Sequence, residues 1–547
     1  MAKTKRKFIF VVGGVMSGVG KGVTSASIGM ILKMKGFRVT SLKADPYVNV
    51  DAGTMNPVEH GEVFVTDDGD ETDQDMGNYE RFLGTNLTSE NYMTTGRVYQ
   101  TVIANERAMK YKGKCVQVVP HIPEEITRRI RHAAEKHDAE FTIVEIGGTV
   151  GEYENILFLE AARMMKLKDP ASVMFVLVSY LPIPGHLGEM KTKPTQHAAR
   201  ELNSVGINPD FIVARGTHYL DAPRREKLAV FCGVEPENCI SAPDVSSIYE
   251  VPLVYQEQEF GKKLLNRFGM KNVATNITDW AKFVKKLSNP KKEVRIAVIG
   301  KYFGTGNYTL ADSYISVIES VKYAAWWNDA KPILEWIDSE EYEKNPKKIT
   351  ELAKYDGIIV PGGFGTRGVE GIMMAIKYAR ETRKPYFGLC YGMQLASIEF
   401  VRNVLGKKEA HTVEVNSNTP DPVIFVNPTQ MTNIRENRYG GTMRLGAYDC
   451  SLMRGTIARA AYGEEKISER HRHRYEFNNA YREACEANGL KISGVNPEAN
   501  LVEIVELENH PFFVGVQFHP EFKSRPMRPH PLFREFVKAA LKLKEKR

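Results

Sequence analysis

The chain has 547 residues, of which 42% are hydrophobic and 26% charged, a balance that is typical of a soluble globular protein and argues against a disordered or fibrous one. The net charge of +7 is modest, and no basic tract is interleaved with aromatic residues, so we expect no nucleic acid partner. The six cysteines show no disulfide-scaffold pattern, and no apolar run reaches the ~18 residues of a membrane span. We therefore expect a cytoplasmic protein without membrane contact.

The first elements predicted are a strand (Phe8–Val12), a glycine-rich turn (Gly13–Gly22) and a helix (Thr24–Lys35). Backbone amides at a helix N-terminus, together with Lys21, suit a polyphosphate. The turn departs from the common phosphate-binding loop, because five residues separate its two framing glycines and Lys21 is followed by glycine. The hydroxyl that usually helps to hold Mg2+ is therefore missing.

Two acidic residues can take over this role. Asp75 ends the run DGDETDQD, and Glu145 follows the apolar strand predicted at residues 141–144. Carboxylates suit Mg2+, and parallel α/β sheets place their ligands at the C-terminal edge of the strands. Glu145 therefore predicts a metal ligand. For the acidic run that ends at Asp75, a solvated loop remains an alternative.

Apolar strands alternate with amphipathic helical stretches in the rest of the chain, for example at residues 173–178, 211–214 and 295–299. This order predicts parallel sheets with crossover helices. Between these strands, GEMKTKPTQH at residues 188–197 is either a solvated charged face or a binding segment. A charged turn at residues 289–292 precedes a new strand and indicates a domain boundary.

The second domain carries a candidate thiol nucleophile. Cys390 in GLCYGMQ follows a predicted strand (Pro385–Leu389) and precedes a helix, so it lies at a sharp strand-to-helix elbow. His519 and Glu521 in FHPEF can supply an imidazolium and its orienter. An earlier loop, PGGFG at residues 361–365, follows a strand at 358–360 and is expected to offer the backbone N–H groups of Gly362, Gly363 and Gly365 to an oxyanion. Taken singly, Cys390 could be a core residue and His519 a surface residue.

In combination, PGGFG, G-x-C-x-G and HPE in this order resemble a class I, triad-type glutamine amidotransferase. Over nearly the whole chain, segments such as DPYVNVDAGTM, HGEVFV, KTKPTQH and GGTMRLGA resemble the CTP synthase family. The resemblance implies a P-loop-like parallel-sheet amidoligase domain (residues 1–267), a linker (268–292) and a class I glutamine amidotransferase α/β domain (293–547). It implies ATP-dependent amination of UTP to CTP through a 4-phosphorylated intermediate, with ammonia from glutamine.

The same resemblance implies the roles of individual residues. The triad would be Cys390, His519 and Glu521, and the metal ligands Asp75 and Glu145. The ATP site would comprise Gly18, Val19, Gly20, Lys21, Gly22, Val23, Lys43 and Asp75. The UTP and CTP site would comprise Ser17, Glu152, Tyr153, Glu154, Lys191, Thr192, Lys193, Pro194, Thr195, Gln196 and Lys227. The glutamine site would comprise Gly363, Gln394, Glu414 and Arg474.

The resemblance further implies Mg2+, activation by GTP, feedback inhibition by CTP and a homotetramer that can form filaments. Four segments depart from the family pattern: Ala108–Lys110, associated with GTP activation, Glu152–Glu154, associated with CTP inhibition, and residues 179–189 and 300–314, which are longer or different. Two alternatives remain at this point. The chain could be a nucleotide-binding protein whose main role is filament assembly, or an amidoligase for another substrate.

Overall fold

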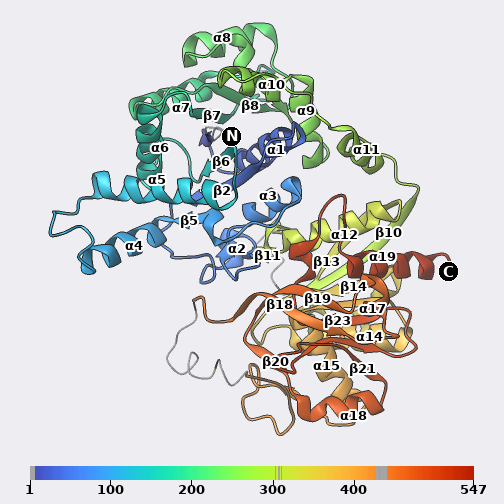
Figure 1. Cartoon of the computed structure of the whole chain (residues 1–547). Coiled ribbons are helices and arrows are strands. Elements are labelled where there is room, and N and C mark those ends of the chain that lie inside the picture. The colour runs from blue at the N-terminus through green and yellow to red at the C-terminus, as the bar shows by residue number, and fades with distance from the viewer. Residues whose placement is uncertain are drawn as a thin grey trace. The chain divides into compact units, whose positions relative to one another are not determined.

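We describe the protein from a computed structural model, which covers residues 6–185, 188–301, 304–305, 308–309, 311–426, 430 and 440–546. The chain forms two compact units (Figure 1): unit 1 contains residues 1–51 and 75–284, and unit 2 contains residues 52–74 and 285–547. Residues 52–74 thus pack in unit 2, although the sequence placed them in the first domain. The stretch at 268–292, expected to be a linker, contains helix α11 (Thr278–Leu287).

Unit 1 is built on a seven-stranded sheet in the order β5-β2-β6-β1-β7-β8-β9, in which every pair is parallel (Figure 1). Burial on both faces explains the continuous apolar run of the central strands. The strands are β1 (Lys7–Gly14), β2 (Val39–Asp45), β5 (Tyr92–Thr94), β6 (Phe141–Ile146), β7 (Val173–Tyr180), β8 (Phe211–Gly216) and β9 (Cys239–Pro243). The predicted parallel α/β fold is confirmed.

Helices cover both faces of this sheet, and successive side chains of β1 point alternately into the two cores that result. Phe8, Phe10 and Val12 face one core, whereas Ile9 and Val11 face the other. The first core is closed by α4 (Thr95–Arg107), α5 (Val118–Lys136), α6 (Ile156–Lys168), α7 (Lys193–Ser204) and α8 (Ala222–Cys232). The second is closed by α1 (Lys21–Met34), α9 (Val251–Glu257) and α10 (Phe260–Arg267), while α3 (Asp75–Leu83) packs on α1.

Unit 2 is built on a nine-stranded sheet in the order β13-β10-β14-β15-β23-β22-β21-β18-β19 (Figure 1). The first five strands in this order, from β13 through β10, β14 and β15 to β23, are parallel. Each later strand is antiparallel to the strand before it in the order. Their bounds are β10 (Lys292–Gly300), β13 (Ala330–Asp338), β14 (Gly357–Val360), β15 (Tyr386–Leu389), β18 (Arg444–Leu452), β19 (Lys466–His473), β21 (Leu490–Val495), β22 (Val502–Leu507) and β23 (Phe513–Val516).

Two cores flank this second sheet as well. One contains α14 (Val369–Thr382) and α15 (Tyr391–Asn403), and the other contains α12 (Ile315–Trp327) and α19 (Pro531–Lys544). Parts of two divergent stretches lie outside the described residues: 302–303, 306–307 and 310 in the stretch at 300–314, and 186–187 in the stretch at 179–189. Among the described residues, no helix combines the length and apolarity needed to cross a membrane.

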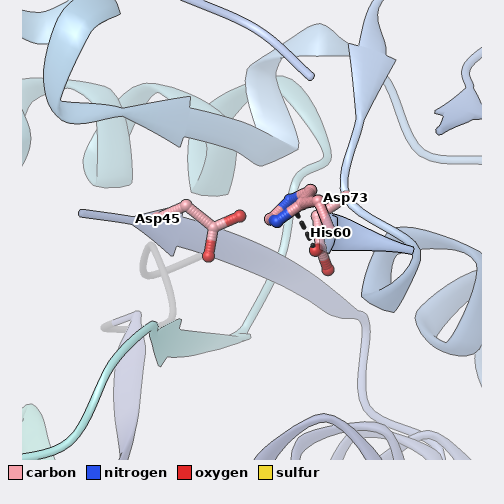
Figure 2. A group of neighbouring side chains, drawn as sticks. All are labelled: Asp45, His60 and Asp73. Atoms are coloured by element: carbon pink, nitrogen blue, oxygen red, sulfur yellow. Dashed lines mark ion pairs between the residues drawn. The ribbon is translucent and has the colours of Figure 1, made fainter. Parts of the chain in front are cut away.

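Residues 52–74, hereafter the hairpin segment, contain α2 (Pro57–His60) and the short antiparallel strands β3 (Phe64–Val65) and β4 (Glu71–Thr72). Figure 2 shows the ion pair that joins the end of α2 to the residue after β4, with His60 Nε2 3.3 Å from Asp73 Oδ2. Glu71 and Asp73 are only 2% and 6% exposed. The alternative of a solvated acidic loop for this run is therefore wrong, because the fold buries two of its carboxylates.

Candidate active sites

The glycine-rich turn of unit 1 connects β1 to α1 and has three residues with positive φ: Val15, Gly18 and Gly20. Gly20, with φ 94°, directly precedes α1, and no side chain caps the first amides of that helix. Lys21 lies at this helix N-terminus, 9% exposed, and its Nζ donates to the carbonyl of Gly148 at 2.8 Å. An uncapped helix N-terminus beside a buried ammonium group is an arrangement suited to phosphate oxygens.

The two acidic residues predicted to bind metal converge on Lys43. Its Nζ lies 2.5 Å from Asp75 Oδ2 and 3.1 Å from Glu145 Oε1. Glu145 is the penultimate residue of β6, and Asp75 is the first residue of α3. Two carboxylates on one ammonium leave an excess of negative charge, and their oxygens are the donors that Mg2+ prefers. The residues present therefore fit a magnesium ion.

The packing of Asp75 also explains the missing hydroxyl. A Cβ at Gly22 would lie 2.1 Å from Asp75 Oδ1, a separation that real side chains do not reach. Serine or threonine after Lys21 is thus excluded by the carboxylate that occupies its space.

One residue of this site was missed by sequence reasoning. Tyr79 is fully buried, and its hydroxyl donates to Glu145 Oε2. Burial and the neighbouring charge of Glu145 raise the pKa of Tyr79 well above its usual value, so the phenol stays a donor. The signal was available, because Tyr79 follows Asp75 by four residues and therefore lies on the same helix face.

The residues predicted for UTP and CTP are spread over four segments of unit 1. Ser17 is exposed in the glycine-rich turn, and Lys227 is exposed on α8. In the segment before and at the start of α7, Thr192, Thr195 and Gln196 are buried, Lys191 and Pro194 are half-buried and Lys193 is exposed. Two of these segments, α7 and the segment with Glu152, are linked by contacts to the region of Lys21.

Two contacts make that link. Close packing brings α7 to the glycine-rich turn, since a Cβ at Gly14 would lie 2.5 Å from the Cβ of Ala198. The Glu152 carboxylate lies beside Gly148, the residue whose carbonyl binds Lys21. Its neighbours Tyr153, 91% exposed, and Glu154 are open to solvent. Lys227 lies on α8, which packs against α7.

Unit 2 places Cys390 at the predicted elbow between β15 and α15. Its backbone has φ 48° and ψ −96°, an uncommon conformation for a residue with a side chain, and its N–H donates to the carbonyl of Val516 at 2.7 Å. The flanking glycines are required by close approach. A Cβ at Gly388 would lie 2.7 Å from Gly392, and a Cβ at Gly392 would lie 2.3 Å from the Val360 carbonyl oxygen.

His519 and Glu521 form the second half of the predicted triad. The Nδ1 of His519 lies 2.7 Å from Glu521 Oε1, and both residues are buried. Burial lowers the pKa of His519, but the charges of Glu521 and of the Cys390 thiolate outweigh it and raise this pKa to about 10. An imidazolium beside the thiol stabilises the thiolate, which is the nucleophilic form.

The Cys390 sulfur is held by two further residues. The sulfur lies 3.8 Å from the carbonyl oxygen of Arg472, to which it donates in its thiol form, and Gln517 Nε2 donates to the sulfur at 3.7 Å. The amide oxygen of Gln517 in turn accepts from Gln394 Nε2 at 3.3 Å. Gln394, predicted to bind glutamine, therefore also belongs to the scaffold of the thiol.

The PGGFG loop lies against this triad. A Cβ at Gly362 would lie 2.8 Å from Cε1 of His519, so the loop and the imidazole are in contact. The prediction of three available amides is wrong for Gly365, because its N–H donates to Glu414 Oε1 at 2.8 Å. Burial raises the pKa of Glu414, while this hydrogen bond lowers it in part. Gly362 and Gly363 remain the candidate oxyanion donors.

Lys301, which the sequence reasoning missed, fastens the same loop. Its Nζ donates to the carbonyls of Phe364 and Gly365 at 3.2 and 2.6 Å and lies 4.6 Å from the ring centre of Tyr391. Burial lowers its pKa to about 8. A lysine directly after strand β10 was a usable signal, because ligand sites gather at this edge of parallel sheets.

Arg474, the last predicted glutamine-binding residue, follows β19 directly. Its Nη1 donates to Thr442 Oγ1 at 2.9 Å and to Gln430 Oε1 at 3.3 Å. A guanidinium is suited to the carboxylate of an amino acid substrate.

The raised pKa of His519 predicts the pH dependence of glutamine hydrolysis. The imidazolium and the stability of its pair with Glu521 are present below the ordinary histidine pKa of ~6.5 and are lost as the pH rises through about 10. We expect kcat/KM to hold at moderately alkaline pH and to fall near pH 10. In Glu521→Gln the descending limb should move toward neutral pH. If ammonia release falls at the same alkaline pH in the wild type and in Glu521→Gln, then Glu521 is not the cause of the raised His519 pKa.

Comparison with known proteins places both halves of the chain in described families. Residues 7–270 match the family described as CTP synthase N-terminus, and residues 309–539 match Glutamine amidotransferase class-I. The CTP synthase of Symbiobacterium thermophilum is 51% identical over 542 residues, 98% of either chain. That of Carboxydothermus hydrogenoformans is 51% identical over 539 residues, 98% of this chain and 99% of the relative.

A solved structure, the glutaminase domain of Trypanosoma brucei CTPS with bound acivicin, is 38% identical and covers 46% of this chain and 94% of its own, with a TM-score of 0.42. The two family matches together span nearly the whole chain, and half of its residues are shared with full-length relatives. The chain therefore belongs to the CTP synthase family.

Proposed function

We propose that this protein converts UTP to CTP with ATP, using ammonia that it releases from glutamine at Cys390. The observation that carries the proposal is that one chain contains two clusters. Unit 2 contains Cys390, His519 and Glu521, and unit 1 contains Lys21, Lys43, Asp75 and Glu145. Similarity to CTP synthases along 98% of the chain supports the same reaction.

In unit 2, the Cys390 thiolate attacks the side-chain carboxamide of glutamine. The C–N bond breaks, His519 gives its proton to the departing nitrogen, and ammonia leaves a γ-glutamyl thioester. Water then cleaves the thioester, with His519 taking the proton and glutamate leaving. Gly363 and its neighbour Gly362 are assigned to donate to the oxyanion, and Arg474 is assigned to hold the substrate carboxylate.

In unit 1, the carbonyl oxygen at position 4 of uracil is a poor leaving group, so ATP first phosphorylates it. Ammonia then attacks position 4 and phosphate departs. Lys21, Lys43 and the amides of Gly18 to Val23 are assigned to the ATP phosphates. Asp75 and Glu145 would hold Mg2+, which supplies charge neutralisation to the phosphates when bound. Ser17, Thr192, Gln196 and Lys227, with their neighbours in the predicted set, are assigned to UTP.

Regulation and assembly belong to the same proposal. GTP as activator, CTP as feedback inhibitor, a homotetramer that can form filaments and a cytoplasmic location are expected from the family. The divergent segments that bear on this are exposed: Met109 within Ala108–Lys110 is 65% exposed, and Tyr153 is 91% exposed. The relatives compared are named CTP synthase, so they favour neither of the two alternatives, an assembly role without catalysis or another substrate.

The experiment is CTP formation from UTP, ATP and Mg2+, with ammonium or glutamine as nitrogen source and with or without GTP. We expect CTP from both sources and a GTP effect on the glutamine reaction alone. Removing Mg2+ with a chelator should abolish both reactions, because Asp75 and Glu145 would then repel the phosphates. No CTP from either source would contradict the proposal, and CTP from ammonium alone would contradict the assignment of the triad.

A further inference from the structure

The hairpin segment lies within the residues that match CTP synthase N-terminus, yet it packs in unit 2 beside the glutaminase triad. Its core is buried: Phe64 is 1% and Val65 0% exposed. Three separate chains of contacts lead from it to the three triad residues. The segment is therefore more than a connection between the two stretches of unit 1.

The first chain of contacts ends at Glu521. The Glu62 carboxylate, 7% exposed, accepts from the backbone N–H of Ser316 at 3.0 Å and from its hydroxyl, at the start of α12. One helical turn later, the Ser320 hydroxyl donates to the Ser316 carbonyl at 2.6 Å and lies 3.4 Å from the Glu521 carbonyl. Glu62 thus fixes the helix end that holds the backbone of the orienting carboxylate.

The second chain ends at His519. The ring of Phe64 packs edge-on against Phe522 at 5.0 Å, and Phe522 stacks on the imidazole of His519 at 5.1 Å. Arg470, fully buried, crosses the same place: it lies over Phe64, donates to the Val65 carbonyl at 3.0 Å and pairs with Asp67 at 2.6 Å. The carbonyl of Arg470 accepts the backbone N–H of His519 at 2.8 Å.

The third chain of contacts ends at Cys390 and passes through a single residue, Arg472. Glu71, 2% exposed, accepts from Arg472 Nε at 2.8 Å. The carbonyl of the same Arg472 accepts the Cys390 thiol at 3.8 Å. Arg472 also donates to the Gly53 carbonyl at 3.3 Å, and a Cβ at Gly53 would lie 2.1 Å from Glu71, so the segment closes tightly around the ion pair.

The second and third chains of contacts both pass through strand β19. Strand β19 alternates its side chains, and both arginines that it directs to the hairpin segment have carbonyls bonded to triad residues: Arg470 to His519 and Arg472 to Cys390. A shift of β19 would change the distance between thiol and imidazole directly. Since a misplacement of ~1 Å can cost ~100-fold in rate, the ion pairs that hold β19 bear on catalysis.

We propose that the hairpin segment is a positioning element of the glutaminase site, and that Glu71 acts through Arg472 to hold Cys390 against His519. The inference rests on the proposed triad and deepens it. Glu71 is a positioning residue and touches no substrate. The glutaminase half is thereby completed by residues of the synthase half of the sequence.

The test compares Glu71→Gln with Glu59→Gln in the full-length chain, since Glu59 is an exposed carboxylate of the same segment. We expect Glu71→Gln to lower kcat for glutamine hydrolysis about tenfold with KM unchanged, and to slow alkylation of Cys390 by iodoacetamide. CTP formation from ammonium should stay at the wild-type rate in both variants. Glu59→Gln should match the wild type in every assay.

A double-variant comparison tests the route through Arg472. Arg472→Met with and without Glu71→Gln should have the same kcat, because one contact is lost in both. Phe64→Leu, which keeps every charge, should lower kcat in the same direction through Phe522. Wild-type kcat in Glu71→Gln, additive losses in the double variant, or an equal loss of the ammonium reaction would overturn the inference.

The two proposals fail separately. If Cys390→Ala still hydrolyses glutamine, the assignment of the triad is wrong. If Cys390→Ala is inactive while Glu71→Gln and Phe64→Leu hydrolyse glutamine normally, the triad stands and only the role of the hairpin segment is refuted.

Discussion

Replacing Cys390 with alanine is expected to abolish glutamine-dependent CTP formation and to leave the reaction with added ammonium unchanged. Alanine removes the nucleophile from an elbow that is otherwise kept, so the loss should reach roughly 10,000-fold or more in glutamine hydrolysis. The synthase residues Lys21, Lys43, Asp75 and Glu145 all lie in unit 1 and are untouched. Measuring CTP at saturating ammonium and, separately, at saturating glutamine separates the two outcomes.

Cys485→Ala is the matched control. This thiol is also buried in unit 2, but burial and the charge of Glu486 raise its pKa to about 12, so it is not a thiolate at neutral pH. It should keep both reactions. Loss of the ammonium reaction in Cys390→Ala would mean that the two chemistries do not have separate sites.

Replacing Lys21 with methionine is expected to abolish CTP formation from either nitrogen source. An ammonium ~4 Å from a phosphate contributes ~4 kcal/mol at an effective dielectric of 20, before desolvation costs. That is roughly a thousandfold in rate if it is expressed in the transition state. Burial lowers the pKa of Lys21 despite the opposing charge of Glu145, and phosphate oxygens beside it would favour the charged form.

Lys33→Met is the control for this change. Lys33 lies in the last turn of the same helix α1 and donates to the Leu83 carbonyl at 2.6 Å, away from the glycine-rich turn. It should keep CTP formation. Glutamine hydrolysis without nucleotides should be the same in both lysine variants, and a thousandfold loss there in Lys21→Met would refute a role confined to ATP.

The fold class was predictable because parallel sheets leave a strong local signal. The run FIFVV is apolar without interruption since β1 is buried on both faces, and the glycines that follow mark where the chain must turn. The elbow at Cys390 was predictable for a similar reason, as only glycine fits at positions 388 and 392. Both are properties of short stretches, which a sequence displays directly.

Other features depend on contacts between distant residues. The sequence offered Gly365 as an amide donor, but Glu414, far along the chain, takes that hydrogen. The missing hydroxyl after Lys21 looked like a gap, whereas the Asp75 carboxylate fills the space. Gln517 carries no motif of its own, and only its position beside the Cys390 sulfur marks it.

The family, the parallel α/β architecture and the proposed reactive groups could be inferred from the chain alone, because local spacing and residue type indicate them. The tertiary structure decided which carboxylates are buried, which amides remain available and that residues 52–74 pack with the glutaminase rather than with the strands that precede and follow them. The physical reason is that burial and ion pairing depend on long-range packing: Glu71 meets Arg472 only when the chain is folded.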